Sequence, residues 1–188
     1  MWPASAALLV MAGLVLLFWR HAPLHEDEAI YASWGLALRH DWWLSHTAVD
    51  KPPLFFYLLA VSLAMLGPSE LAARLPNLFV TLVAAIFVVR LVAQRRDSMA
   101  ALGAGLLFLA APLTQVYAAG AFTDPLMLAL TLAAAERARA GWPRASGLLL
   151  GAAVLAKPTA LFLAPLVVAF LLLQRYWQSG LAAGSVKE

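Results

Sequence analysis

Long, uninterrupted apolar runs are the feature that most constrains the fold of this chain. Hydrophobic residues make up 63% of the 188 residues and charged residues 12%, and the mean hydropathy is +0.82. About 20 consecutive apolar residues cross a bilayer as a helix. Backbone groups in lipid must bond internally, and the runs are continuous in Leu, Ala and Val without period-two alternation. The sequence therefore predicts an all-α integral membrane protein.

The runs arrange the chain as one polytopic membrane domain with five to six transmembrane helices. We expect a first, retained span in residues 1–20, an outer loop with juxtamembrane helices in 21–70, the remaining spans in 71–175 and a tail in 176–188. The apolar runs cover residues 4–19, 54–66, 75–93, 99–119, 126–135 and 146–173.

Basic residues predict the topology. Two loops and the tail collect them: Arg90, Arg95 and Arg96, then Arg137, Arg139 and Arg144, then Arg175 and Lys187. The positive-inside rule makes these segments cytoplasmic and places the polar segment 20–51 outside. Run 54–66 is then expected to lie along the outer interface, since 13 residues are too few to cross comfortably.

The last run, 146–173, is longer than a straight span requires. Lys157 is costly at mid-depth and Pro158 removes a backbone donor. Two short helices that meet near Lys157 are one interpretation, and a single tilted, kinked span is the other.

The polar segment holds all four histidines and five of the ten carboxylates. Ionisable groups beside a bilayer are expensive, so a dense cluster there indicates a functional site. Asp27 and Tyr31 are four residues apart, hence on one face of a helix, where a carboxylate could act as a general base. The alternative is structural, because Glu26, Asp27 and Glu28 also suit a helix N-terminus.

Lys51 lies between Asp50 and two prolines that forbid a helix through it. A cation fixed in such a turn suits a phosphate oxyanion. The alternative is an interfacial lysine that extends toward lipid head groups.

Three further charges are candidates for the same outer cavity. Asp124 follows a potential N-cap, Thr123, and could face Asp27. Arg74 could pair with a carboxylate such as Glu70, four residues earlier, or with an anionic ligand, and we favour the structural pairing. Lys157 could contact a lipid phosphate or lie at the tip of a hairpin.

Metal and nucleic-acid functions find little support in the residues. His21, His25, His40 and His46 lack tight ligand spacing and are expected to be solvated. The net charge of +3 is spread along the chain, which argues against nucleic acid as a partner. There are no cysteines, so thiolate chemistry is excluded.

Five motifs in order carry a family resemblance. They are Asp27-Glu28-Ala29-Ile30-Tyr31-Ala32, Asp50-Lys51-Pro52-Pro53-Leu54, Glu70-Leu71-Ala72-Ala73-Arg74-Leu75-Pro76, Thr123-Asp124-Pro125 and Leu155-Ala156-Lys157-Pro158. The chain resembles the N-terminal half of C-type membrane glycosyltransferases, in particular bacterial protein O-mannosyltransferase-like and aminoarabinose-transferase-like enzymes.

The resemblance implies sugar transfer from a polyprenyl-phosphate donor to a lipid, glycan or protein acceptor at the outer face of a bacterial inner membrane. It implies that Asp27 is the base or orients the acceptor, that Lys51 contacts the donor phosphate and that Asp124 supports the cavity. Glu28, Tyr31, Asp50, Arg74 and Lys157 are the expected substrate-binding residues. No cofactor is expected, although the acid before the lysine binds a divalent metal in some relatives, where it is the longer glutamate.

Two other functional classes stay open at this point. Family members carry about twice as many spans, so the chain is expected to be a fragment, to work with other membrane subunits, or to be a non-catalytic structural subunit of a larger complex. A small transporter is a weaker interpretation, because transporters bind substrate near mid-span and the charges of this chain gather at the outer edge.

Overall fold

The computed structural model describes residues 23–45, 49–163, 165, 169 and 173. Every regular element among them is an α-helix, as the composition predicts. The helices are α2 (Glu26–Ala37), α3 (Leu54–Leu66), α4 (Glu70–Ala93), α5 (Ser98–Ala110), α6 (Pro112–Ala119), α7 (Asp124–Arg139) and α8 (Pro143–Ala156). The expected first span and the tail lie outside the described residues.

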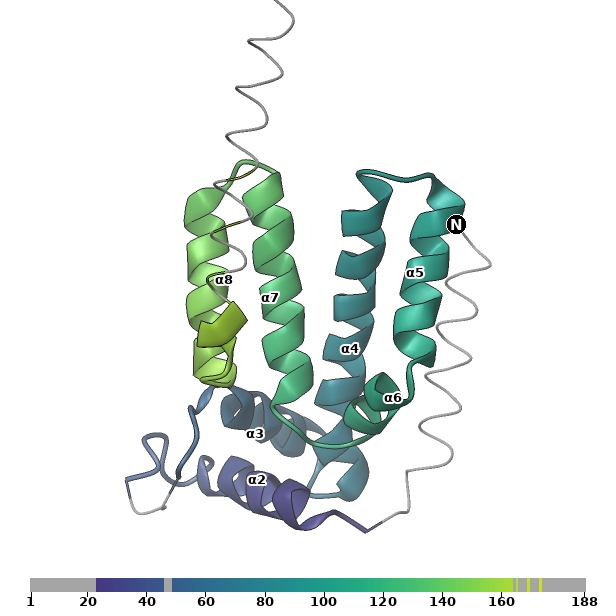
Figure 1. Cartoon of the computed structure of the whole chain (residues 1–188). Coiled ribbons are helices and arrows are strands. Elements are labelled where there is room, and N and C mark those ends of the chain that lie inside the picture. Colours follow the sequence, from purple (N-terminus) through teal and green to yellow (C-terminus); the bar gives the residue numbers. More distant parts are fainter. Residues whose placement is uncertain (1–22, 46–48, 164, 166–168, 170–172, 174–188) are drawn as a thin grey trace, which may run out of the picture.

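The long helices run side by side, and α2 and α3 lie across one end of them (Figure 1). Helix α4 packs against α5 on one side and α7 on the other, and α7 packs against α8. We call the end covered by α2 and α3 the α2–α3 end. The N-terminus of α4 and the short helix α6 lie at this end as well.

Helix α4 is, among the described residues, the one helix long and apolar enough to cross a membrane by itself. Its 24 residues extend roughly 36 Å, somewhat more than the hydrocarbon core. The pair α5 and α6 passes the same test only as a broken unit, and α3 and α8 are shorter apolar helices. The all-helical class is thus confirmed, whereas five to six spans stays a prediction.

Run 99–119 is not the continuous span that its length suggests. Helix α5 ends at Ala110, α6 begins at Pro112, and the two axes differ by 62°. Proline lacks an amide donor and its ring excludes the preceding residues from a continuing helix, so Pro112 starts a new helix at its first position. The bend turns α6 along the α2–α3 end.

The break expected near Lys157 is present. Helix α8 ends at Ala156, Lys157 has extended backbone angles, and residues 160–163 are helical again. Helix α3 has the bounds of the expected juxtamembrane helix, Leu54–Leu66, and Lys51 lies outside it, as the proline pair predicts.

The two arginine-rich loops lie at the same end of the bundle, opposite α2 and α3. The Arg90 guanidinium is 2.6 Å from the buried Glu136 carboxylate, which also pairs with Arg137. The Arg139 side chain contacts the Leu91 carbonyl. These contacts join the C-termini of α4 and α7, as the charge pattern predicts. That this end is cytoplasmic stays a prediction.

Helices α2 and α3 form the main apolar core with the start of α4. Phe55, Phe56, Leu59 and Leu63 of α3 are almost wholly buried. A Cβ on Gly35 of α2 would lie 3.0 Å from the Leu59 Cβ, so the glycine permits the close approach of the two helices. This core fixes α2, the helix that carries Asp27, relative to α4.

Candidate active site

Helix α2 begins at a capping box that sequence reasoning missed. His25 is the N-cap, and its imidazole accepts a hydrogen bond from the Asp27 amide at 3.4 Å. Its own amide donates to the Glu28 carboxylate at 2.8 Å. A reciprocal pair of this kind satisfies two of the amides that a helix start leaves open. The structural interpretation of the acidic cluster therefore holds for Glu28.

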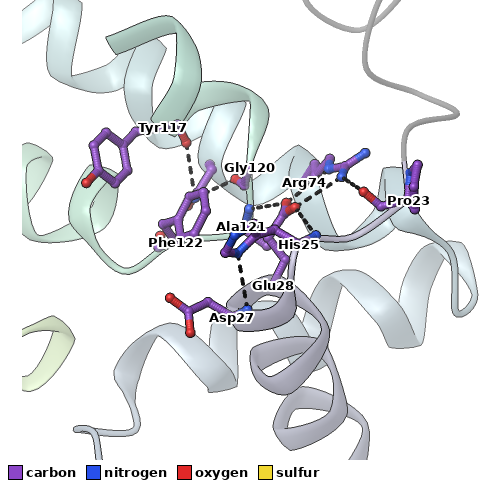
Figure 2. Close-up of polar contacts among 10 residues, drawn as sticks. Pro23, His25, Asp27, Glu28, Arg74, Tyr117, Gly120, Ala121 and Phe122 are labelled. Carbon is purple, nitrogen blue, oxygen red and sulfur yellow. Dashed lines mark hydrogen bonds and ion pairs between the residues drawn. The ribbon is translucent and has the colours of Figure 1, made fainter. Parts of the chain in front are cut away.

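Glu28 and Arg74 form a buried ion pair between α2 and α4 (Figure 2). Arg74 Nε lies 3.0 Å from Glu28 Oε1, and Arg74 Nη2 lies 3.1 Å from Oε2. Arg74 makes the structural pairing with a carboxylate that we favoured, but its partner is Glu28 and not Glu70, because Arg74 is buried where α4 meets α2. Glu70 lies in the exposed first turn.

The Glu28 carboxylate also accepts the amide of Ala121, at 2.8 Å, from the connection between α6 and α7. Both of its oxygens are thus engaged, and only 4% of the residue is exposed. Burial alone would raise the pKa of Glu28, but the hydrogen bonds from Arg74 and from the amides of His25 and Ala121 outweigh burial and lower it. This geometry favours a structural role for Glu28 and Arg74 over direct contact with substrate.

Asn77 ties the same connection to α4 and was not among the residues singled out from the sequence. Its amide nitrogen donates to the carbonyls of Gly120 and Phe122 at 2.7 and 2.8 Å. A Cβ on Gly120 would lie 2.4 Å from the Phe122 ring, so this turn needs glycine. A polar residue inside an apolar 24-residue helix was the signal that could have identified Asn77.

Asp27 is exposed, in contrast to Glu28. Its side chain points away from the Glu28–Arg74 pair (Figure 2). The first turn of α2 thus buries the Glu28 carboxylate inside the protein and leaves the adjacent Asp27 carboxylate at the surface.

Lys51 reaches α2 from the segment before α3. Its ammonium lies 5.1 Å from the centre of the buried Tyr31 ring and 3.7 Å from the Asp50 carboxylate. Hydrogen bonding to the Tyr31 side chain raises the pKa of Lys51 against a smaller effect of desolvation, and the negative charges of Asp50 and Asp27 raise it further. Tyr31, Asp50 and Asp27 therefore all lie within electrostatic reach of the Lys51 ammonium.

Asp124 and Lys157 form a further ion pair. Lys157 Nζ lies 2.6 Å from Asp124 Oδ1, and each side chain is 30% exposed. Asp124 opens α7 directly after Thr123, which occupies the N-cap position without a side-chain capping bond. The pair connects the start of α7 to the break after α8.

A pocket of about 200 Å³ lies beside Asp124, between α4, α5, α6 and α7. Its walls are mainly apolar, with hydroxyls from Thr81, Thr114 and Tyr117. Asp27 and Lys51 are not among its lining residues. Among the described residues, the single cavity that we expected is therefore replaced by two separate places, the exposed region around Asp27 and Lys51 and the pocket beside Asp124. No group of three or more His, Cys, Asp or Glu side chains in the described part of the chain could hold a metal ion.

A family model described as dolichyl-phosphate-mannose-protein mannosyltransferase matches residues 50–184. The chain belongs to this family. No curated protein and no solved structure matches it.

Membership of the mannosyltransferase family makes this a chain of the membrane glycosyltransferase class, and it confirms the resemblance drawn from the five motifs. The matched region contains Lys51, Arg74, Asp124 and Lys157. Asp27, Glu28 and Tyr31 precede it, so their link to the family's chemistry depends on their contacts with matched residues. Arg74 provides one such contact and Lys51 the other.

Proposed function

We propose that the chain transfers a sugar from a polyprenyl-phosphate donor to an acceptor at the outer face of a bacterial inner membrane. The acceptor is a lipid, a glycan or a protein. The family supplies the reaction class, and the α2–α3 end, opposite the arginine-rich loops, supplies the face on which we place the reaction.

The observation that carries this proposal is the placement of Lys51 beside Tyr31 and near Asp27. The lysine ammonium lies 5.1 Å from the Tyr31 ring centre, and Tyr31 follows Asp27 by one helical turn. The charge of the exposed Asp27 carboxylate therefore reaches the partly exposed Lys51 ammonium. In such a pair, the cation can stabilise a leaving phosphate while the carboxylate accepts the proton of an attacking hydroxyl.

In the proposed reaction, an acceptor hydroxyl attacks the anomeric carbon while Asp27 takes its proton. The bond from that carbon to the phosphate oxygen breaks, and the electron pair leaves with the polyprenyl phosphate. Attack from the face opposite the phosphate inverts the anomeric configuration. Lys51, protonated at neutral pH as lysines ordinarily are, stabilises the charge that grows on the leaving phosphate.

The other candidates take supporting roles in this proposal. Tyr31 and Asp50 hold the Lys51 ammonium, and Glu28 and Arg74 fix α2. Asp124 borders the neighbouring pocket, and Lys157 pairs with Asp124. We assign no metal ion to Asp50, because the contacts of its carboxylate in the described residues are to Lys51. Membrane lipids and further membrane subunits are the partners that this arrangement allows.

The test measures sugar transfer from a radiolabelled polyprenyl-phosphate donor by membranes that contain the full chain. We expect Asp27→Asn and Lys51→Ala each to reduce transfer by about 100-fold or more. Glu26→Gln, an exposed carboxylate one residue away, is the matched control and should keep normal transfer. Equal background for the unmodified chain and both variants would overturn catalysis and favour a non-catalytic subunit.

A further inference from the structure

The connection between α2 and α3 exposes two adjacent tryptophans. Trp42 is 65% exposed and Trp43 is 88% exposed. Indole rings bury 150–250 Å² when packed, so two of them left outside a core indicate a surface that contacts something else. Neither residue belongs to the candidate active site.

Residues 41–45 of this connection make contacts that position the two rings. Asp41 Oδ1 accepts hydrogen bonds from the Trp43 amide and the Ser45 hydroxyl, both at 3.1 Å. Leu44 is buried and has a positive φ of 52°, a conformation that is costly for a leucine. The leucine thus anchors the connection in the core while the tryptophans point outward.

Helix α3 fixes the connection from the other side. The Tyr57 hydroxyl donates to the Trp42 carbonyl at 2.6 Å, and the Tyr57 and Trp42 rings stack with centres 5.9 Å apart. Trp42 is therefore tied to the juxtamembrane helix, and Trp43 extends beyond it.

The position of this connection matches the depth of the lipid head groups. Helix α4 exceeds the hydrocarbon core by a few ångströms, so its N-terminus reaches the interface. Helices α2 and α3 lie at that level, and in the view of Figure 1 the described residues of the connection between them lie to one side, left of α8. A segment that projects sideways at this depth meets lipid rather than bulk water.

We propose that Trp42 and Trp43 form an anchor that inserts into the outer interfacial layer of the bilayer. Tryptophan favours this layer because its ring is apolar and its N–H can bond to water or head groups. Arg39 and His40, both exposed and just before the tryptophans, complement anionic lipid phosphates. The anchor holds α2 and α3 flat against the membrane surface.

The chain has no cysteines, which permits a direct test of depth. A nitroxide label is attached to Trp43→Cys in the full chain, in vesicles of phosphatidylethanolamine and phosphatidylglycerol. Relaxation of the label by oxygen, which concentrates in lipid, is compared with relaxation by a water-soluble nickel chelate. The control is Arg96→Cys, an exposed site in the polar connection between α4 and α5.

We expect the oxygen effect to exceed the nickel effect severalfold at position 43, and the order to reverse at position 96. A label at position 43 relaxed mainly by nickel would overturn the proposal, since the site would then be aqueous. A label shielded from both reagents would also overturn it, in favour of a protein partner or second copy. Thermal unfolding of Trp43→Cys in detergent, expected to match the unmodified chain, verifies that the labelled protein is folded.

Discussion

The carboxylate of Glu28 and the guanidinium of Arg74 form a two-bond fork although 46 residues separate them in the sequence. The same carboxylate accepts amides from His25 and Ala121. One buried group therefore joins the start of α2, the N-terminal part of α4 and the connection between α6 and α7. Asp27 owes its position at the surface to this arrangement.

Removal of one partner from this fork should be strongly destabilising. Arg74→Leu leaves a buried carboxylate without its counter-charge, and we expect a loss of about 3 kcal/mol in the free energy of unfolding. Arg74→Lys should recover only part of this loss, because an ammonium cannot reproduce the fork. Unfolding in detergent, followed by circular dichroism, measures both. Stability equal to that of the unmodified chain would contradict the central role of the pair.

The same carboxylate predicts a pH dependence of stability. The pKa of Glu28 is lowered in the folded state, so its contribution is fully present above the ordinary glutamate pKa of about 4.3 and is lost as pH falls through the lowered value. The difference in unfolding free energy between the unmodified chain and Glu28→Gln should therefore be constant near neutral pH and shrink as pH falls below the ordinary glutamate pKa and through the lowered one. Glu26→Gln, which changes an exposed carboxylate, should show a much smaller difference at every pH.

A double-mutant cycle can separate the contribution of the Asp124–Lys157 pair to stability from its contribution to sugar transfer. Because both side chains are partly exposed, we expect a coupling energy of at most about 1 kcal/mol between Asp124→Asn and Lys157→Met. Unfolding in detergent measures the coupling, and sugar transfer is measured for the same variants.

The transfer data decide between two roles for Asp124. If the only role of Asp124 is to pair with Lys157, the double variant should transfer sugar as well as whichever of the two single variants is more active. If its carboxylate acts on substrate, the double variant should stay inactive although its stability is regained. We expect the second result, because Asp124 borders the pocket.

Local signals in the sequence predicted much of the fold. The length of run 54–66 gave α3 its bounds, Lys157-Pro158 marked the break after α8, and the arginines predicted which loops share an end. Pro112 was as visible as Pro158, but it lies inside a run of span length, and hydropathy alone suggested a continuous helix.

Long-range pairing explains what sequence reasoning could not supply at the site. An interval of four residues made Glu70 the obvious partner for Arg74, and only the packing of α2 on α4 brings Glu28 closer. The pairing of Asp124 with Lys157 likewise depends on how α7 and α8 lie together. Lys51 differs, because the prolines beside it fixed its turn locally.

Helix α4 contains Pro76 without a broken helix, and Ser62 of α3 explains how. In a regular helix the amide of residue 76 would donate to the carbonyl of Ala72, but proline has no amide proton. The Ser62 hydroxyl donates to that carbonyl instead, at 2.6 Å. Ala72 is 1% exposed, and a buried carbonyl needs such a partner because it has no access to water.

Ser62→Ala should therefore cost about 1 to 3 kcal/mol in the free energy of unfolding, because it leaves the Ala72 carbonyl unsatisfied. In a Pro76→Ala background the cost should fall close to zero, because the restored amide of residue 76 now donates to that carbonyl. Ser33→Ala, which removes a hydroxyl that bonds the Ile30 carbonyl at an exposed site, should have little effect in either background. An equal loss from Ser62→Ala in both backgrounds would mean that the hydroxyl stabilises α3 for a reason unrelated to the proline.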